Sequence, residues 1–115
     1  MPRHMSFFLT QDQMRARSKT VTRRFGWKFL SPADILWAVE KGHGLKKGEQ
    51  VKKIGLIEVV STRWEPLNAI TQEDVSREGF PDWSPEEFVS FLVKHHKCPV
   101  DEPVHRIEFK HIQSD

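Results

Sequence analysis

The sequence contains a single cysteine, Cys98, among 115 residues. An intramolecular disulfide needs two cysteines and a multi-cysteine zinc site needs more, so both are excluded. A chain without disulfides is typical of a reducing compartment, and we therefore predict a cytoplasmic location. Because Cys98 precedes Pro99 at an expected helix end, we interpret it as a structural thiol.

Long apolar runs are also missing. No segment approaches the roughly 20 apolar residues that a membrane-spanning helix needs, and the start of the chain lacks the apolar region of a signal peptide. We therefore expect no membrane association. Met5 is an alternative start, which leaves open whether residues 1–4 are native. Neither an internal repeat nor a low-complexity segment is present.

A strong net charge is absent as well. The 18 Lys and Arg residues face 16 Asp and Glu residues, which gives a formal net charge of +2. This value is too small to drive bulk attraction to DNA or a membrane, so electrostatic recognition depends on where the charges lie. With 37% hydrophobic and 30% charged residues, residues 1–115 fit one compact domain.

One stretch lacks acidic residues altogether. Between Gln13 and Ala33 there is no Asp or Glu, whereas several cations and aromatic rings lie there: Arg15, Arg17, Lys19, Arg23, Arg24, Phe25, Trp27, Lys28 and Phe29. This cationic and aromatic segment suits a partner with negative charge and flat rings, as in nucleic acid or a nucleotide. The alternative is a solvated basic strand and loop whose aromatic side chains belong to the core.

Periodicity and turn signals predict an α+β domain. We expect strands at Met5–Leu9, Ile35–Val39, Val51–Thr62 and His105–Ile112, extended chain at Lys19–Arg24, a short helix at Gln11–Arg17, and two late helices after Thr71 and Ser84. Residues 41–50 contain three glycines and should form a loop that joins an antiparallel strand pair.

A small curved sheet or partly closed barrel would bury the apolar residues of these strands together. The expected core consists of Phe7, Leu36, Val39, Leu56, Val59, Ile107 and Phe109. Thr10, Thr71 and Ser84 precede the helices and are candidate N-caps, because their side-chain oxygens can accept hydrogen bonds from free backbone N–H groups.

Four short segments are more specific than this general pattern: Lys19–Arg24, the turn Pro32–Asp34, Leu67–Thr71 and Glu78–Phe80. Together with the order of the elements, they resemble the ASCH domains of the PUA-like superfamily. The resemblance covers nearly the whole chain. Within that group, the chain is most similar to a short bacterial or phage-encoded type containing Arg-Arg-x-Gly-Trp.

The resemblance implies a small β-barrel of about five strands with two to three flanking helices, and a cleft for RNA or a nucleoside. Some small ASCH proteins are amidohydrolases that remove the acyl group of N4-acetylcytidine and related nucleosides with a Lys, a Thr and a Glu. By position, these residues fall on Lys19, Thr22 and Glu78. Other members are linked to ribonuclease activity or to RNA-associated roles, so the fold alone does not define the reaction.

The three residues make chemical sense as a set. A threonine hydroxyl needs a neighbouring base to act as a nucleophile, and a lysine serves as that base when it is held neutral. In a regular strand, however, Lys19 and Thr22 would face opposite sides, so the chain has to bend around Val21. The alternative is a partly buried ion pair between Lys19 and Glu78, with Thr22 only packing.

A second set predicts ligand binding: Thr20, Arg23, Arg24, Trp27 and Lys28. Arginine suits phosphate and base edges, and an exposed tryptophan stacks on a base. Arg23 stands where the amidohydrolases often carry an apolar residue, which favours a charged ligand such as a nucleotide. The alternative is that Trp27 and Phe29 close the bottom of the barrel.

The six histidines do not predict a metal site. His95 and His96 are adjacent on a helix and point apart, whereas His105 and His111 share one strand face without an acidic or sulfur partner. His43 lies in a loop. We therefore expect no metal and no cofactor. Trp64 and Trp83 are predicted to pack in loops.

Two function classes remain open from the sequence. One is a domain that binds RNA or a modified nucleoside in a basic pocket, and the other is a hydrolase of the N4-acylcytidine type, with ribonuclease activity as a lesser alternative. Convergence of Lys19, Thr22 and Glu78 in a closed pocket would favour chemistry. A pocket open along its length, with arginine and tryptophan at its floor, would favour binding of a strand.

Overall fold

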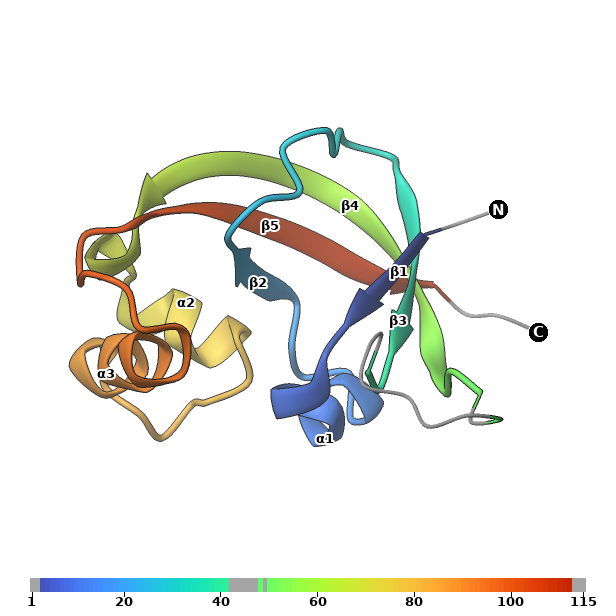
Figure 1. Cartoon of the computed structure of the whole chain (residues 1–115), viewed down its shortest axis with the longest axis horizontal. Helices are drawn as coiled ribbons and strands as arrows, with labels where there is room; N and C mark the ends of the chain where they lie inside the picture. The colour runs from blue at the N-terminus through green and yellow to red at the C-terminus, as the bar shows by residue number, and fades with distance from the viewer. Residues whose placement is uncertain (1–2, 42–47, 49, 113–115) are drawn as a thin grey trace.

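The computed structural model describes residues 3–41, 48 and 50–112. Its strands are β1 (Arg3–Ser6), β2 (Val21–Arg24), β3 (Ile35–Val39), β4 (Lys53–Pro66) and β5 (Pro103–Ile112) (Figure 1). Its α-helices are α1 (Gln11–Arg15), α2 (Gln72–Arg77) and α3 (Pro85–His96). Short 3-10 helices lie at Phe8–Thr10 and Leu67–Ala69. No helix in the described ranges is long and apolar enough to cross a membrane.

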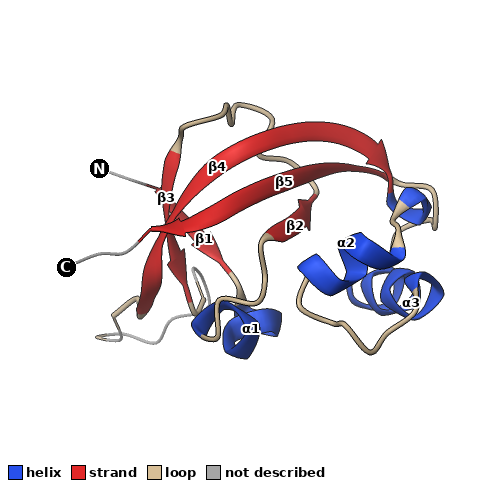
Figure 2. Ribbon diagram, turned by 180° about the vertical axis from the view of Figure 1, so that it is seen from behind, coloured by secondary structure: helices blue, strands red, loops and turns tan. Residues whose placement is uncertain are grey.

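The five strands form one curled sheet in the order β1-β3-β4-β5-β2. β1 pairs with β3 in parallel, and the other neighbours are antiparallel. The long strands β4 and β5 arch from the β1–β3 end to the helices α2 and α3 (Figure 2). The predicted α+β class, the curved half-barrel and the antiparallel pair of β3 and β4 are thus confirmed. Most of the predicted 41–50 loop lies outside the described residues.

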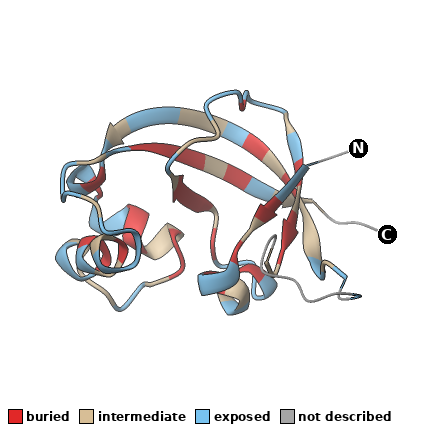
Figure 3. Cartoon of the chain, viewed as in Figure 1, coloured by how far each residue is buried: buried red, intermediate tan, exposed pale blue. Residues whose placement is uncertain are grey.

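Two apolar clusters stabilise the molecule. The first lies inside the curled sheet and contains Met5, Phe7, Met14, Leu30, Leu36, Ala38, Ile57, Val59, Ile107 and Phe109. The second joins the helices to the far ends of β4 and β5 and contains Leu67, Ile70, Val75, Phe88, Val89, Leu92 and Val104. Buried residues also run along β2, between these two clusters (Figure 3).

The predicted core needs one correction. Five of its seven members pack in the first cluster, and Val39 is fully buried, but Leu56 is only half-buried. The reason is strand alternation, because Ile57 and Val59 point into the core and Leu56 therefore faces the other way.

Local cap signals explain both late helices. Thr71 accepts a hydrogen bond from the Asp74 backbone at the start of α2. Ser84 and Glu87 form a reciprocal capping box at the start of α3, where Pro85 occupies the first turn. The predicted caps of α2 and α3 are therefore confirmed.

Three predicted boundaries near the N-terminus and on β4 are wrong. The opening strand ends at Ser6 because the chain turns into a 3-10 helix, and Thr10 makes no side-chain cap. α1 ends at Arg15, and Arg17 has a left-handed φ of 60°. β4 continues beyond Thr62 because β5 pairs with it as far as Pro66, past a register shift between Val59 and Ser61.

Candidate functional site

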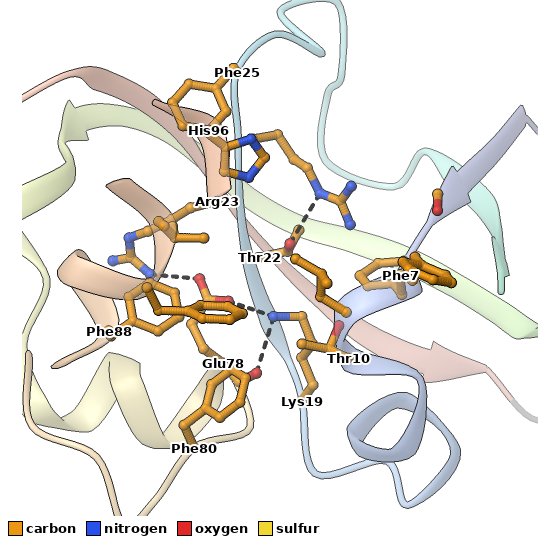
Figure 4. Close-up of a pocket in the computed structure, with 16 residues that line it drawn as sticks. Phe7, Thr10, Lys19, Thr22, Arg23, Phe25, Glu78, Phe80, Phe88 and His96 are labelled. Carbon is orange, nitrogen blue, oxygen red and sulfur yellow. Dashed lines mark hydrogen bonds and ion pairs between the residues drawn. The ribbon is translucent and has the colours of Figure 1, made fainter. Parts of the chain in front are cut away.

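A cavity of about 310 Å³ lies between the sheet and the helices. Its apolar wall includes six phenylalanines: Phe7, Phe8, Phe25, Phe80, Phe88 and Phe91. Its polar lining consists of Lys19, Thr22, Arg23, Arg24, Glu78 and His96, together with Ser6 and Thr10 (Figure 4). The cavity is therefore lined by both aromatic and charged side chains, and all three predicted catalytic residues are among the charged and polar ones.

Lys19 and Glu78 form a buried pair among these residues. They are 2% and 3% exposed. The Lys19 ammonium donates one hydrogen bond to the Glu78 carboxylate and a second, 3.0 Å long, to the Glu78 backbone carbonyl. The backbone and the side chain of Glu78 thus both hold the Lys19 ammonium, and the Lys19 side chain points toward Glu78 (Figure 4).

Backbone contacts from three elements hold these two residues in place. The Lys19 N–H donates to the Gln13 carbonyl, and the His111 imidazole bonds the Lys19 carbonyl at 2.8 Å. Glu78 caps the C-terminus of α2, where its N–H donates to the Asp74 carbonyl. α1, α2 and β5 thus position one ion pair.

The environment of Lys19 weakens its protonated form. Burial lowers the pKa of Lys19 below its ordinary value, and this effect outweighs the attraction of Glu78, which raises it. The positive charges of Arg24 and Arg23 lower the pKa further. Arg23 also donates to the second oxygen of Glu78 at 3.0 Å, so that carboxylate divides its charge between two cations.

Thr22 reaches the cavity from β2 and is 4% exposed. Lys19 lines the same cavity because the regular strand starts only at Val21, so strand alternation does not extend back to Lys19. The Arg24 Nε donates to the Thr22 hydroxyl oxygen at 3.1 Å. Among the described residues, no hydrogen bond joins Lys19 directly to Thr22.

Arg23 is not available to a ligand in this structure, although it lines the cavity. Its guanidinium donates to Asp74 at 2.7 Å and to Glu65 at 2.8 Å, in addition to Glu78. Only its Nε has no partner among the described residues. Arg23 therefore serves as the centre of an ionic cluster.

Asp74 and Arg106 complete this cluster. The Arg106 guanidinium donates to both Asp74 oxygens, at 2.6 and 3.0 Å. Burial alone would raise the pKa of Asp74, but the hydrogen bonds from Arg106 and Arg23 outweigh it and hold the pKa well below its usual range. Sequence reasoning missed Arg106 and Glu65. The available signal was an arginine directly before the predicted core residue Ile107.

Three of the other predicted binding residues lie apart from the cavity lining. Thr20 is half-buried, Lys28 is exposed, and Trp27 packs against the first apolar cluster with a left-handed φ of 58°. Arg24 does line the cavity, and its guanidinium lies over the Phe7 ring, 4.6 Å from the ring centre. Sequence reasoning also missed His96, whose ring packs on Phe25 at 4.6 Å.

No group of three or more metal-ligating side chains occurs in the part of the chain that the structure describes. His105 contacts the Gly26 carbonyl at 3.2 Å and stacks on Trp64. Trp64 was predicted to pack in a loop, but it lies on β4 because that strand is longer than expected. The predicted loop position of Trp83 is confirmed, and its ring stacks on Phe80.

Solved structures share this fold. Protein EF3133 from Enterococcus faecalis, described under the family model DUF984, is 14% identical, with a TM-score of 0.66 over 97% of this chain and 80% of that one. The hypothetical protein PH0355 is 18% identical, with a TM-score of 0.67 over 97% of this chain and 100% of that one. An ASCH domain from Lactobacillus crispatus is 17% identical, with a TM-score of 0.64 over 95% of this chain and 78% of that one.

These similarities confirm the predicted ASCH resemblance at the level of the fold. Sequence comparison adds nothing further, since no family model and no curated protein matches the chain.

Proposed function

We propose that this ASCH-fold domain binds a nucleobase or nucleoside in its cavity and hydrolyses an acyl amide on the exocyclic amine, as in N4-acetylcytidine. One observation carries the proposal. Lys19, Thr22 and Glu78 line a single cavity, and Lys19 is hydrogen-bonded to Glu78. Lys19 and Thr22 come from one segment and Glu78 from another, and their convergence on one cavity supports a chemical role over passive packing.

The dimensions of the cavity suit a ligand of this class. A volume of about 310 Å³ falls at the lower end of small-molecule pockets. Aromatic rings such as Phe80 and Phe88 offer flat apolar surfaces on which a base can stack, a contact worth about 1–3 kcal/mol per base. The charged and polar side chains beside these rings would then contact the polar edge and the acyl amide of the base.

In the proposed reaction, neutral Lys19 takes the Thr22 hydroxyl proton while the Thr22 oxygen attacks the acyl carbonyl carbon. Collapse of the tetrahedral intermediate breaks the carbon–nitrogen bond, and the leaving amine takes the proton back from Lys19. Water, deprotonated by Lys19, then attacks the acyl-threonine ester. As the ester bond breaks and the carboxylic acid leaves, the Thr22 oxygen takes the proton back from Lys19, which becomes neutral again. The lowered pKa of Lys19 increases the share of the neutral amine that this cycle needs.

Arg24 and Glu78 assist these steps, Arg24 through Thr22 and Glu78 through Lys19. The hydrogen bond from Arg24 stabilises negative charge on the Thr22 oxygen as the proton leaves. Glu78 holds the Lys19 side chain in the cavity through two hydrogen bonds. It also stabilises the ammonium that forms transiently on Lys19.

Recognition of RNA or a modified base without hydrolysis is the second candidate. It is favoured by the exposed rim of the cavity, where Phe8, Leu9 and Phe25 are 60%, 46% and 42% exposed. Apolar rings around an opening suit stacking with the bases that flank a bound one. No contact in the described site specifically favours ribonuclease chemistry.

A nucleoside panel separates these candidates. We expect the protein to release acetate from N4-acetylcytidine, detected by mass spectrometry, and Thr22→Ala and Lys19→Met to lower kcat/KM at least 1000-fold, because each removes a reacting group. Thr62→Ala on β4 is the matched control and should retain activity. Thermal unfolding of each variant verifies that it folds.

Absence of turnover on every acylated nucleoside would reject the hydrolase. Binding of the same nucleosides, measured by quenching of tryptophan fluorescence, would then support recognition alone. If Thr22→Ala retained full activity in a folded protein, the proposed nucleophile would be wrong.

A further inference from the structure

Arg24 differs from every other cation of the cavity in having no carboxylate partner among the described residues. Lys19, Arg23 and Arg106 are balanced by Glu78, Asp74 and Glu65, three cations against three carboxylates. Arg24 stands outside this balanced set. Its only polar contact among the described residues is the hydrogen bond from its Nε to the Thr22 hydroxyl oxygen. Arg24 therefore carries a positive charge that no carboxylate of the described residues pairs directly, although the charge of Glu78 still raises its pKa.

The free part of Arg24 is the part that suits an anion. An arginine carries five N–H donors, four of them on its two terminal nitrogens, in a fork that fits the oxygens of phosphate or carboxylate. These four donors make no hydrogen bond to any described residue. The guanidinium face packs on the Phe7 ring, which fixes its plane without using its donors. The Arg24 side chain thus carries a positive charge and four terminal N–H donors that no described residue accepts from.

His96 offers an unpaired ring nitrogen beside Arg24. It lines the same cavity, its ring packs on Phe25, and neither ring nitrogen has a hydrogen-bond partner among the described residues. Burial, followed by the positive charges of His95 and Arg24, lowers the pKa of His96. Burial also lowers the pKa of Arg24 to about 10, so Arg24 stays protonated at neutral pH.

We propose that Arg24, with His96 beside it, forms an oxyanion subsite of the cavity, and that the natural ligand carries a phosphate or carboxylate group that pairs with the Arg24 terminal nitrogens. The terminal nitrogens of Arg24 are not among the buried unpaired atoms of the described residues, so a ligand can reach them. Charge-assisted bidentate hydrogen bonds are the strongest contacts that an arginine makes with an anion. The subsite lies next to Thr22, so it orients the ligand relative to the nucleophile.

The subsite deepens the proposed function, on which it rests for the rest of the ligand. The oxyanion has two chemical sources in an acylated nucleoside: a phosphate on the sugar, or a free carboxylate on the acyl group. Both present the same oxygens to Arg24, and substrates distinguish them.

Anion binding is tested first without any reaction. Inorganic phosphate is titrated into the ¹⁵N-labelled full chain, and the Arg24 Nε–H resonance is followed by NMR. We expect saturable shifts of this resonance and of the backbone amide of Thr22. The backbone amide is present in every variant, and it should report at least tenfold weaker phosphate binding in Arg24→Gln. Arg24→Lys keeps the charge but loses the fork, and should bind with intermediate affinity. Arg17→Gln, at an exposed arginine that does not line the cavity, should bind like the wild type.

Turnover then identifies the source of the oxyanion. N4-acetylcytidine, its 5′-monophosphate and N4-succinylcytidine are compared at low salt. We expect one of the two anionic substrates to show at least tenfold higher kcat/KM than the neutral nucleoside, and Arg24→Gln to remove this preference. The preferred substrate tells whether the phosphate or the acyl carboxylate occupies the subsite.

The outcomes are separable. If the Arg24 resonance does not respond to phosphate, and the anionic substrates show no advantage, the subsite is wrong even where N4-acetylcytidine is hydrolysed. If no substrate is hydrolysed but phosphate shifts the Arg24 resonance, and the Thr22 backbone amide reports at least tenfold weaker phosphate binding in Arg24→Gln, the reaction is wrong and the subsite stands.

Discussion

At the scale of the residue, the charged side chains of the site differ in whether an oppositely charged side chain pairs with them. Arg106 and Arg24 are both arginines that lie near the boundary between sheet and helices, yet they differ in environment. Arg106 is 3% exposed and bonds both oxygens of Asp74. Arg24 is half-buried and meets no carboxylate of the described residues. A residue type therefore does not determine its role here, because the role depends on what the fold places opposite it.

Because of this difference, we expect substitution of the two arginines to lower the free energy of unfolding by different amounts. Arg106→Met should lower the free energy of unfolding by about 3–5 kcal/mol, because it leaves Asp74 buried with part of its charge uncompensated. Arg24→Met should change it by less than about 1 kcal/mol, because the loss of one hydrogen bond is offset by removal of an unpaired cation. Urea unfolding monitored by circular dichroism measures both. Equal losses in the two variants would contradict the assignment of partners.

At the scale of the element, the end of α2 determines where Glu78 lies. The helix ends because Gly79 adopts a left-handed φ of 105°, and Glu78 is the residue just before it. A Cβ at position 79 would lie 2.5 Å from Cγ of Gln13, so α1 packs directly against this turn. The same turn thus ends a helix, packs two helices together and directs Glu78 toward Lys19.

Gly79→Ala should therefore affect stability and activity together. We expect a loss of about 1–3 kcal/mol of unfolding free energy, because alanine is strained at this φ and Gln13 has to move. Hydrolysis should fall as Glu78 shifts away from Lys19. Gly55→Ala on β4 is the matched control, since nothing lies within 4 Å of its added Cβ and its φ is not left-handed. If both variants behaved like the wild type, the turn would not position the site.

At the scale of the whole molecule, an ionic layer joins the sheet to the helical cluster. Arg23 comes from β2, Arg106 from β5, Glu65 from β4 and Asp74 from α2. The two apolar clusters lie on either side, and the cavity opens beside the layer (Figures 3 and 4). Charged residues at this boundary allow the sheet and the helices to meet without filling the space between them.

Because of this ionic layer, we expect the free energy of unfolding to fall at low pH. The pKa of Asp74 is lower in the folded protein than in the unfolded chain, so the unfolded chain binds more protons as the pH falls. The stabilisation from Asp74 is therefore present above the unfolded pKa of about 3.9, and it is lost as the pH falls below that value.

Urea unfolding between pH 7 and pH 3 tests this dependence. The wild type should lose stability steeply below about pH 4, whereas Asp74→Asn should be less stable at pH 7 and show a shallower slope, because the titrating group is gone. Identical slopes would mean that other carboxylates dominate the acid response.

Several features were determined by the sequence alone, because they depend on neighbours along the chain. The caps at Thr71 and Ser84, the strand Ile35–Val39 and the turn at Pro32–Asp34 follow from local hydrogen bonding and dihedral preferences. The ASCH resemblance and the candidate set Lys19, Thr22 and Glu78 also came from short motifs.

Only the tertiary structure decided how those candidates are arranged. Lys19 meets Glu78 across 59 positions of sequence, and Arg23 meets Asp74 across 51. Such contacts depend on how strands and helices pack, which local preferences do not encode. The same packing turned Arg23 from an expected ligand-binding residue into an internal ion-pair partner and left Arg24 unpaired, because three carboxylates converge on one guanidinium and none on the other.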